Sequence, residues 1–281
     1  MKKLLLSVMA FALMYSVNAQ IDTPPPSPSA KIEQKVGLTD VVLEYSRPSM
    51  RGRTIFGDLV PYDKLWRTGA NKNTMITFSD EVKIAGKTLK AGSYAIFTKP
   101  GKTSWDVIFY SDTNNWGTPQ EWDDSKVAVK ATAQIYEMPM KVETFTMTFD
   151  DLSSGSAVLG MLWENVYVGV PFEVPTDKTV TASINKVMNG PSANDYYAAA
   201  VYYSREGKDI NQAKEWIDKA MSMIEKPAFW HFRQQSLIYA KAGDKKAAIA
   251  TAKKSLAGAE EAGNADYIKM NKDSLKEWGA L

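Results

Sequence analysis

The residues best suited to recognising a ligand lie close together in the stretch from Arg47 to Asn71. Three arginines fall within the seven residues 47–53, and a Trp-Arg pair follows at positions 66 and 67. A guanidinium group binds carboxylates or phosphates through two parallel hydrogen bonds, and an indole offers a flat surface for a sugar or aromatic ring. We therefore predict a ligand pocket built from Arg51, Arg53, Tyr62, Trp66, Arg67 and Asn71.

The same arginines have a structural alternative. They could form ion pairs with internal carboxylates such as Glu44 or Glu164 and so hold a long loop against a sheet. A long segment without regular secondary structure has to satisfy its own backbone polar groups, and it needs partners for that. The sequence leaves open whether the arginines bind a ligand or fix the loop.

Side chains that commonly carry catalysis are scarce. The chain has no cysteine, and its single histidine, His231, stands in the aromatic run 229–232. This excludes a Ser-His-Asp triad in the N-terminal part and a metal site made of several His or Cys ligands. His231 is expected to pack on a helix. We assign no catalytic residue, and we expect no cofactor and no metal site.

Acidic clusters suggest two weaker kinds of chemistry. Residues 112–123 resemble a calcium-binding loop, but Trp116 stands where an oxygen ligand is needed and Asp123 replaces the bidentate glutamate. A polar turn that carries an exposed aromatic ring is the expected structure. The carboxylate pairs at 123–124 and 150–151 could serve acid/base hydrolysis, although adjacent carboxylates in a loop are usually solvated.

Short apolar runs separated by turn residues predict the strands that must carry these groups. Residues 144–149 alternate threonine with apolar side chains, so one face of that strand is buried and the other is wet. A hairpin should turn at residues 85–86, and residues 94–97 should pair with 105–110. Strands at this density, without amphipathic helices between them, predict an all-β antiparallel sandwich or barrel over residues 31–187.

A small all-α domain of helical hairpins is predicted over residues 191–281. Near Gly190 the apolar period changes from two to about 3.6 residues, and alanine becomes common. A Tyr-x3-Gly motif at Tyr203 recurs at Tyr239, 36 residues later. This pattern resembles the tetratricopeptide repeat, whose period is about 34 residues. Two repeats build little concave surface, so a plain helical bundle without a binding role is the alternative.

The N-terminus predicts export. Two lysines precede an apolar stretch at residues 4–17 that ends in small residues, the pattern of a signal peptide over residues 1–19. The stretch is shorter than the ~20 residues that span a bilayer, so we expect cleavage before Gln20 and no membrane insertion afterwards. A Pro-rich leader, residues 20–30, then precedes the first strand. The expected location is periplasmic or extracellular.

The charge of the mature chain argues against nucleic-acid partners. Cleavage would remove two lysines and leave 32 basic and 32 acidic residues. There is also no run of five like charges. A neutral chain of this kind lacks the basic surface by which proteins bind a phosphate backbone.

Three longer segments carry more specific motifs. They are GRTIFGDLVPYDKLWRTGAN (52–71), LKAGSYAIFTKPGKTSWDVIFY (89–110) and MLWENVYVGVPFEV (161–174). In these motifs the chain resembles a bacterial exported family catalogued as domain of unknown function 2911, over about residues 27–175. The resemblance implies a β-sandwich, with a helical repeat tail as a known accompaniment, but no activity. Asp63 stands where the family pattern has glycine, which bears on the local turn.

These observations favour a non-catalytic module that binds a ligand or partner, which could be a small molecule, a glycan or a protein. The alternative is a hydrolase or isomerase that acts on envelope or glycan material with carboxylate and arginine chemistry. The absence of a nucleophile-base pair favours binding.

Overall fold

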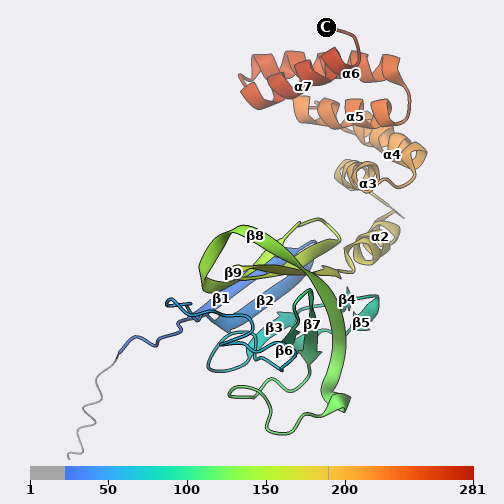
Figure 1. Ribbon diagram of the computed structural model, residues 1–281. Helices are drawn as coiled ribbons and strands as arrows, with labels where there is room; N and C mark the ends of the chain where they lie inside the picture. The colour runs from blue at the N-terminus through green and yellow to red at the C-terminus, as the bar shows by residue number, and fades with distance from the viewer. Residues whose placement is uncertain (1–22, 189) are drawn as a thin grey trace, which may run out of the picture. The chain divides into compact units, whose positions relative to one another are not determined.

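The computed structural model describes residues 23–188 and 190–281, and the chain forms two compact units. The first unit ends at Thr176 and carries the strands, whereas the second begins at Asp177 and is helical (Figure 1). The predicted order, a β-domain followed by an all-α domain, is confirmed. The predicted signal peptide, residues 1–19, lies outside the described residues.

Antiparallel strands in the order β1-β2-β3-β6-β7-β8-β9-β4-β5 build the described part of the β-domain. The strands are β1 (Ser29–Val36), β2 (Thr39–Ser46), β3 (Thr74–Phe78), β4 (Val82–Ile84), β5 (Lys87–Leu89), β6 (Gly92–Pro100), β7 (Ser104–Tyr110), β8 (Val127–Asp150) and β9 (Ser156–Glu173). A short 3-10 helix, η1 (Asp124–Lys126), precedes β8.

The long strand β8 belongs to two layers of the domain. Its residues 127–134 pair with β7, and its residues 135–150 pair with β9. The β8–β9 register shifts between Glu137 and Thr146, and irregularities of this kind bend a strand. Figure 1 shows β8 curving along the domain. The sheet therefore turns a corner within this one strand.

The core lies between the two layers. The rings of Phe78 on β3 and Phe172 on β9 lie 5.6 Å apart, and those of Tyr45 on β2 and Phe145 on β8 lie 5.9 Å apart. Neither pair belongs to neighbouring strands of the sheet. The Tyr45 hydroxyl also accepts a hydrogen bond of 3.0 Å from the Met147 amide. These contacts between layers make the fold a sandwich.

The local pairings expected from the sequence are present. β4 pairs with β5 across Ala85 and Gly86, whose φ angles of 49° and 74° suit a two-residue hairpin turn. β6 pairs with β7 as predicted. In β8, Phe145 and Met147 are buried while Thr146 between them is partly exposed, which confirms the alternation.

The second unit is built of helical hairpins. Its helices are α2 (Thr176–Val187), α3 (Ala193–Arg205), α4 (Ile210–Met223), α5 (Phe229–Lys241), α6 (Lys245–Glu261) and α7 (Ala265–Glu277). α3 packs on α4 and α5 on α6, and in the loops after α3 and α5 the glycines Gly207 and Gly243 adopt positive φ. The repeated small and apolar positions on α4 and α6 are fully buried: Ala213, Ile217, Ala220, Ala248, Ala252 and Ser255.

One helix was not foreseen. The range predicted for the β-domain, residues 31–187, ends in α2, although Val180, Ile184 and Val187 stand at helical spacing and could have indicated it. No helix within the described residues is long and apolar enough to cross a membrane.

The turn between β1 and β2 depends on Gly37. Its φ is 56°, and a Cβ there would collide with the Thr176 side chain and the Ser154 carbonyl oxygen. We expect Gly37→Ala to lower the free energy of unfolding by about 3 kcal/mol, because the cost of a positive φ for alanine and the cost of the Cβ overlap both contribute. Gly86→Ala is the matched control: φ is 74° but the space is open, so the expected loss is about 1 kcal/mol. Urea unfolding of both variants gives the comparison, and equal losses would contradict it.

Candidate functional site

The predicted ligand-binding residues lie on an irregular segment, residues 47–73, that joins β2 to β3. Two bridges attach it to the sheet. Ser49 bridges to Thr144 on β8, with their hydroxyl oxygens 2.9 Å apart. Trp66 bridges to Thr98 on β6 through two backbone hydrogen bonds of 2.7 and 2.9 Å. The segment is therefore held by both layers of the sandwich.

Backbone strain is concentrated in this segment. Arg51, Asp63, Thr68 and Asn71 have φ angles of 51° to 59°, a conformation that is uncommon for residues other than glycine. Thr68 is β-branched and fully buried, so its conformation is the most costly of the four. Asp63 adopts a left-handed conformation, φ 59°, where the resemblance led us to expect glycine, and Asp tolerates this region.

Hydrogen bonds and tight packing fix the turn at Thr68. Its hydroxyl donates to the Thr98 hydroxyl at 3.2 Å, and its carbonyl accepts from the Thr74 hydroxyl. Gly69 follows with φ 143°, and a Cβ there would lie 2.9 Å from the Ser46 carbonyl oxygen. These bonds and the close approach of the Ser46 backbone thus hold the strained conformation of Thr68 in place.

Five of the six predicted residues line one open pocket of about 440 Å³. The lining residues are Pro26, Ser27, Pro48, Ser49, Arg51, Arg53, Leu59, Val60, Trp66, Arg67, Gly69, Ala70, Asn71 and Trp163. Tyr62 is the exception. It is partly buried against the core, its ring is close to Gly57, and the Lys102 ammonium lies 5.9 Å from the ring centre.

The pocket arginines bond to backbone carbonyls. Arg53 donates to the Met50 and Ser49 carbonyls at 2.8 and 2.7 Å, and Arg67 donates to the Asn71 carbonyl at 3.1 Å. In the described part of the chain, neither they nor Arg51 take part in an ion pair, so the alternative is wrong in naming Glu44 or Glu164 as partners, whereas the carbonyl bonds of Arg53 and Arg67 do fix the loop. The Glu164 carboxylate instead accepts from the Ile55 amide at 3.3 Å and pairs with Lys141 at 3.6 Å.

Trp66 forms part of the pocket floor rather than a free stacking surface. Its ring is stacked on Trp163, with centroids 5.8 Å apart and planes 18° apart. Its indole N–H donates to the Gly69 carbonyl at 3.2 Å. Edge contacts complete the aromatic cluster, which comprises Phe56, Trp66, Trp105, Phe145 and Trp163. The expected stacking of a ligand ring on Trp66 is therefore not favoured by the packing.

All the charged residues that line the pocket are arginines. Three guanidinium groups line it, and none of its lining residues is Asp or Glu. The hydrogen-bond partners of these guanidinium groups are neutral carbonyls, and the nearby Glu143 carboxylate is bonded to the Arg51 backbone amide rather than to a guanidinium. Such a pocket is suited to an anion, since hydrogen bonds between a guanidinium and an anion are about twice as strong as neutral ones.

A second loop, residues 111–126, packs beside this segment, and sequence reasoning did not connect the two. Asn73 and Asn115 exchange two hydrogen bonds: the Asn73 amide donates to the Asn115 carbonyl at 3.1 Å, and the Asn115 amide donates to the Asn73 side-chain oxygen at 3.0 Å. A Cβ at Gly117 would lie only 3.4 Å from the Arg67 guanidinium, so the loop reaches that side chain as well. Only spatial contact links these residues, so no sequence signal could have revealed the pairing.

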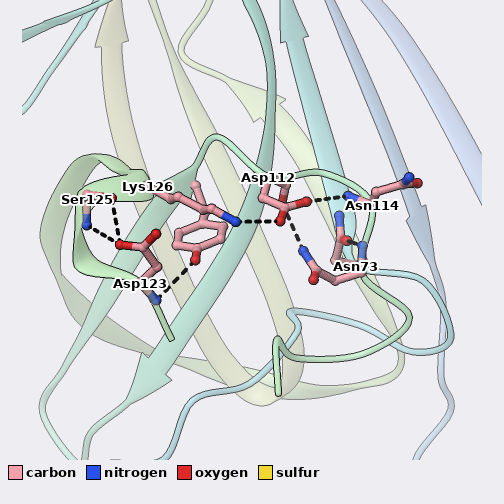
Figure 2. A network of polar contacts seen from close by, with 8 residues as sticks. Asn73, Asp112, Asn114, Asp123, Ser125 and Lys126 are labelled. Carbon is pink, nitrogen blue, oxygen red and sulfur yellow. Dashed lines mark hydrogen bonds and ion pairs between the residues drawn. The ribbon is translucent and has the colours of Figure 1, made fainter. Parts of the chain in front are cut away.

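A polar network holds this second loop together (Figure 2). The Asp112 carboxylate accepts from the Lys126 ammonium at 3.0 Å and from the Asn114 amide at 3.2 Å. Both interactions stabilise the carboxylate and lower the pKa of Asp112, with the Lys126 contact the larger cause. The Asp123 carboxylate accepts two bonds from Ser125, which lower its pKa in the same way.

The resemblance of this loop to a calcium site does not extend to its geometry. Asp112 and Asp123 are engaged as described above, and no group of three or more potential acidic or histidine ligands occurs in the described residues. Trp116 is 79% exposed, as predicted for a polar turn that carries an aromatic ring.

The remaining chemical groups have structural partners. His231 accepts a hydrogen bond of 3.0 Å from the Ala228 amide and so caps α5, and burial lowers its pKa. The Asp124 carboxylate accepts from the Trp122 indole at 2.9 Å. Asp150 accepts from the Tyr167 hydroxyl at 2.9 Å. None of these residues lines the arginine pocket.

Comparison with known proteins identifies a family. The family model "Protein of unknown function (DUF2911)" matches residues 27–172, which include the strands of the β-domain up to Phe172 on β9 and every pocket-lining residue except Pro26. No curated protein and no solved structure shows a significant match to the chain.

The Asp112 network should make stability depend on pH. Because the folded-state pKa of Asp112 is lowered, its contribution is fully present above the unfolded pKa of about 3.9 and is lost as the pH falls through the folded value. We expect Asp112→Asn to lower the melting temperature at pH 6 and to have a smaller effect near pH 3. Asp58→Asn, an exposed carboxylate outside the network, is the control. A pH-independent effect of Asp112→Asn would refute the assignment.

Proposed function

Because the chain belongs to the DUF2911 family, whose description specifies no activity, we propose its function from the site itself: the β-domain is a non-catalytic module that binds an anionic ligand in the arginine pocket. The observation that carries this proposal is the convergence on one open pocket of Arg51, Arg53 and Arg67, whose guanidinium groups form no ion pair in the described part of the chain.

Their arrangement suits recognition of a carboxylate, phosphate or sulfate group. Each guanidinium has five N–H donors, and the bonds to carbonyls described above use one or two of them. The bonds of Arg53 and Arg67 to carbonyls of their own segment orient these two groups in advance, which lowers the entropic cost of binding. The side-chain amide of Asn71 adds a donor at the same rim.

The alternative of a hydrolase or isomerase has less support. Acid/base hydrolysis needs carboxylates beside the bound substrate, and none lines the pocket. The candidate pairs at 123–124 and 150–151 lie elsewhere, and three of their members accept hydrogen bonds from neighbouring side chains. This arrangement favours binding over catalysis.

We further propose that the module acts outside the cytoplasm, since the first residues match the pattern of a cleaved signal peptide. The helical hairpins are proposed to be tetratricopeptide-like. The 36-residue recurrence of Tyr-x3-Gly and the buried small residues on α4 and α6 support this.

Anion binding is tested with sulfate, phosphate, citrate and glucuronate at matched ionic strength, by calorimetry and by the shift in melting temperature. We expect at least one of these anions to bind and to stabilise the protein. Arg51→Gln and Arg53→Gln should each weaken that binding by about tenfold or more, because each removes a charge-assisted contact worth about 1.5–3 kcal/mol.

Arg47→Gln provides the matched control. Arg47 lies on the same segment and also bonds to a backbone carbonyl, that of Phe145 at 3.1 Å, but it does not line the pocket. It should leave anion affinity unchanged even if it lowers stability. Equal losses of affinity in all three variants, or no binding of any anion, would reject the proposal.

A further inference from the structure

The rim of the arginine pocket is partly occupied by the chain itself. Residues 24–28, here called the strap, form a Pro-rich segment without regular secondary structure that bends at Pro26 and Ser27, and these two residues line the pocket. The Arg51 guanidinium donates to the Pro26 carbonyl at 2.8 Å, and the Asn71 side-chain amide donates to the Ser27 carbonyl at 3.2 Å. Two of the donors proposed to bind a ligand are thus engaged with the strap.

We propose that the strap is a competitive internal occupant of the site: an anionic ligand takes over the Arg51 and Asn71 donors and releases residues 24–27. This inference rests on the proposed function and specifies how that same site is regulated. The ligand class follows from the competition, because the ligand has to offer acceptors that are stronger than a peptide carbonyl.

The balance of hydrogen bonds favours exchange. A hydrogen bond from a guanidinium to a neutral carbonyl is weaker than one to an anion. The bond to an anion is shorter and about twice as strong. The strap also loses little apolar burial on release, since Pro24, Pro25 and Pro26 are exposed. Against this, prolines are already fixed near their extended conformation, so docking the strap costs little entropy. The strap therefore docks readily and yields to a charged competitor.

Contacts at Pro28 and Ser29 limit how much of the chain the ligand can displace. The Arg47 amide donates to the Pro28 carbonyl at 2.9 Å, and Ser29 pairs with Ser46 as the first residue of β1. These contacts hold the chain at the end of the strap. Residues 24–27 can leave while β1 stays in the sheet.

The site keeps its shape when the strap leaves. Arg51 is held in its left-handed conformation by its own amide, which donates to the Glu143 carboxylate at 2.8 Å, and by the neighbouring Met50 amide, which donates to the Glu143 carbonyl at 2.8 Å. Neither bond involves the strap. The backbone at Arg51 therefore keeps its place, and the Asn71 side-chain amide keeps a second bond of 3.4 Å to the Ser46 hydroxyl oxygen.

The first measurement follows the strap directly. The chain has no cysteine, so Thr23→Cys can carry a single nitroxide at the start of the strap. We expect its EPR spectrum to sharpen as citrate, or whichever of the four anions binds tightest, is added, with the same midpoint as the binding curve. Sodium chloride at the same ionic strength should have no such effect. A nitroxide at Lys87→Cys, on β5 and away from the pocket, should stay unchanged.

The second measurement weakens the strap without touching the donors. Pro25→Gly combined with Pro26→Gly keeps the carbonyl at position 26 but makes the free strap more flexible. Competition predicts a three- to tenfold gain in affinity for the same anion, about the effect of two such substitutions on chain entropy. Pro139→Gly, an exposed proline of β8 outside the pocket, is the control and should change nothing.

The outcomes separate the two proposals. If the anion binds but the nitroxide spectrum is unchanged, or if the double glycine variant binds equally or more weakly, the strap is a bystander or a wall of the site and the competition is wrong. The proposed function then stands. If no anion binds to any variant, both proposals fall.

Discussion

The packing of Trp66 is the constraint on which the site depends. Its backbone is hydrogen-bonded to Thr98 on one layer, and its ring is stacked on Trp163 of the other. A segment of 27 residues without regular structure would otherwise lose much conformational entropy on ordering. One anchored indole within it divides the segment into two shorter loops, and each can then be fixed by a few polar contacts.

Those polar contacts come at a cost in stability. The arginines that hold the loops donate to carbonyls, so they form no ion pair. Such bonds stabilise the fold less than bonds to a carboxylate would. Arg51 and Thr68 also have left-handed backbone conformations that residues other than glycine rarely adopt. Strained residues of this kind are concentrated at functional sites in proteins generally.

How much could be predicted from the sequence depended on whether the signal was local. The strand alternation around Phe145 and Met147 and the hairpin turn at Gly86 are properties of neighbouring residues, and both were predicted correctly. The placing of five site residues around one pocket followed from their spacing on one segment. The aromatic surroundings of Trp66, the carbonyl partners of the arginines and the pairing of Asn73 with Asn115 depend on how the folded chain brings its parts together. Periodicity and composition carry no information on such contacts.

The position of β9 at the end of the domain has a consequence for synthesis. β9 supplies Trp163 to the pocket floor, and its last residues pair with β4 at Lys83 and Ile84. While the chain is growing, the hairpin of β4 and β5 has an unpaired edge until residue 173 is available, and such edges are templates for wrong pairing. The pocket is therefore among the last parts of the domain that a nascent chain can complete, although most of its residues are made early.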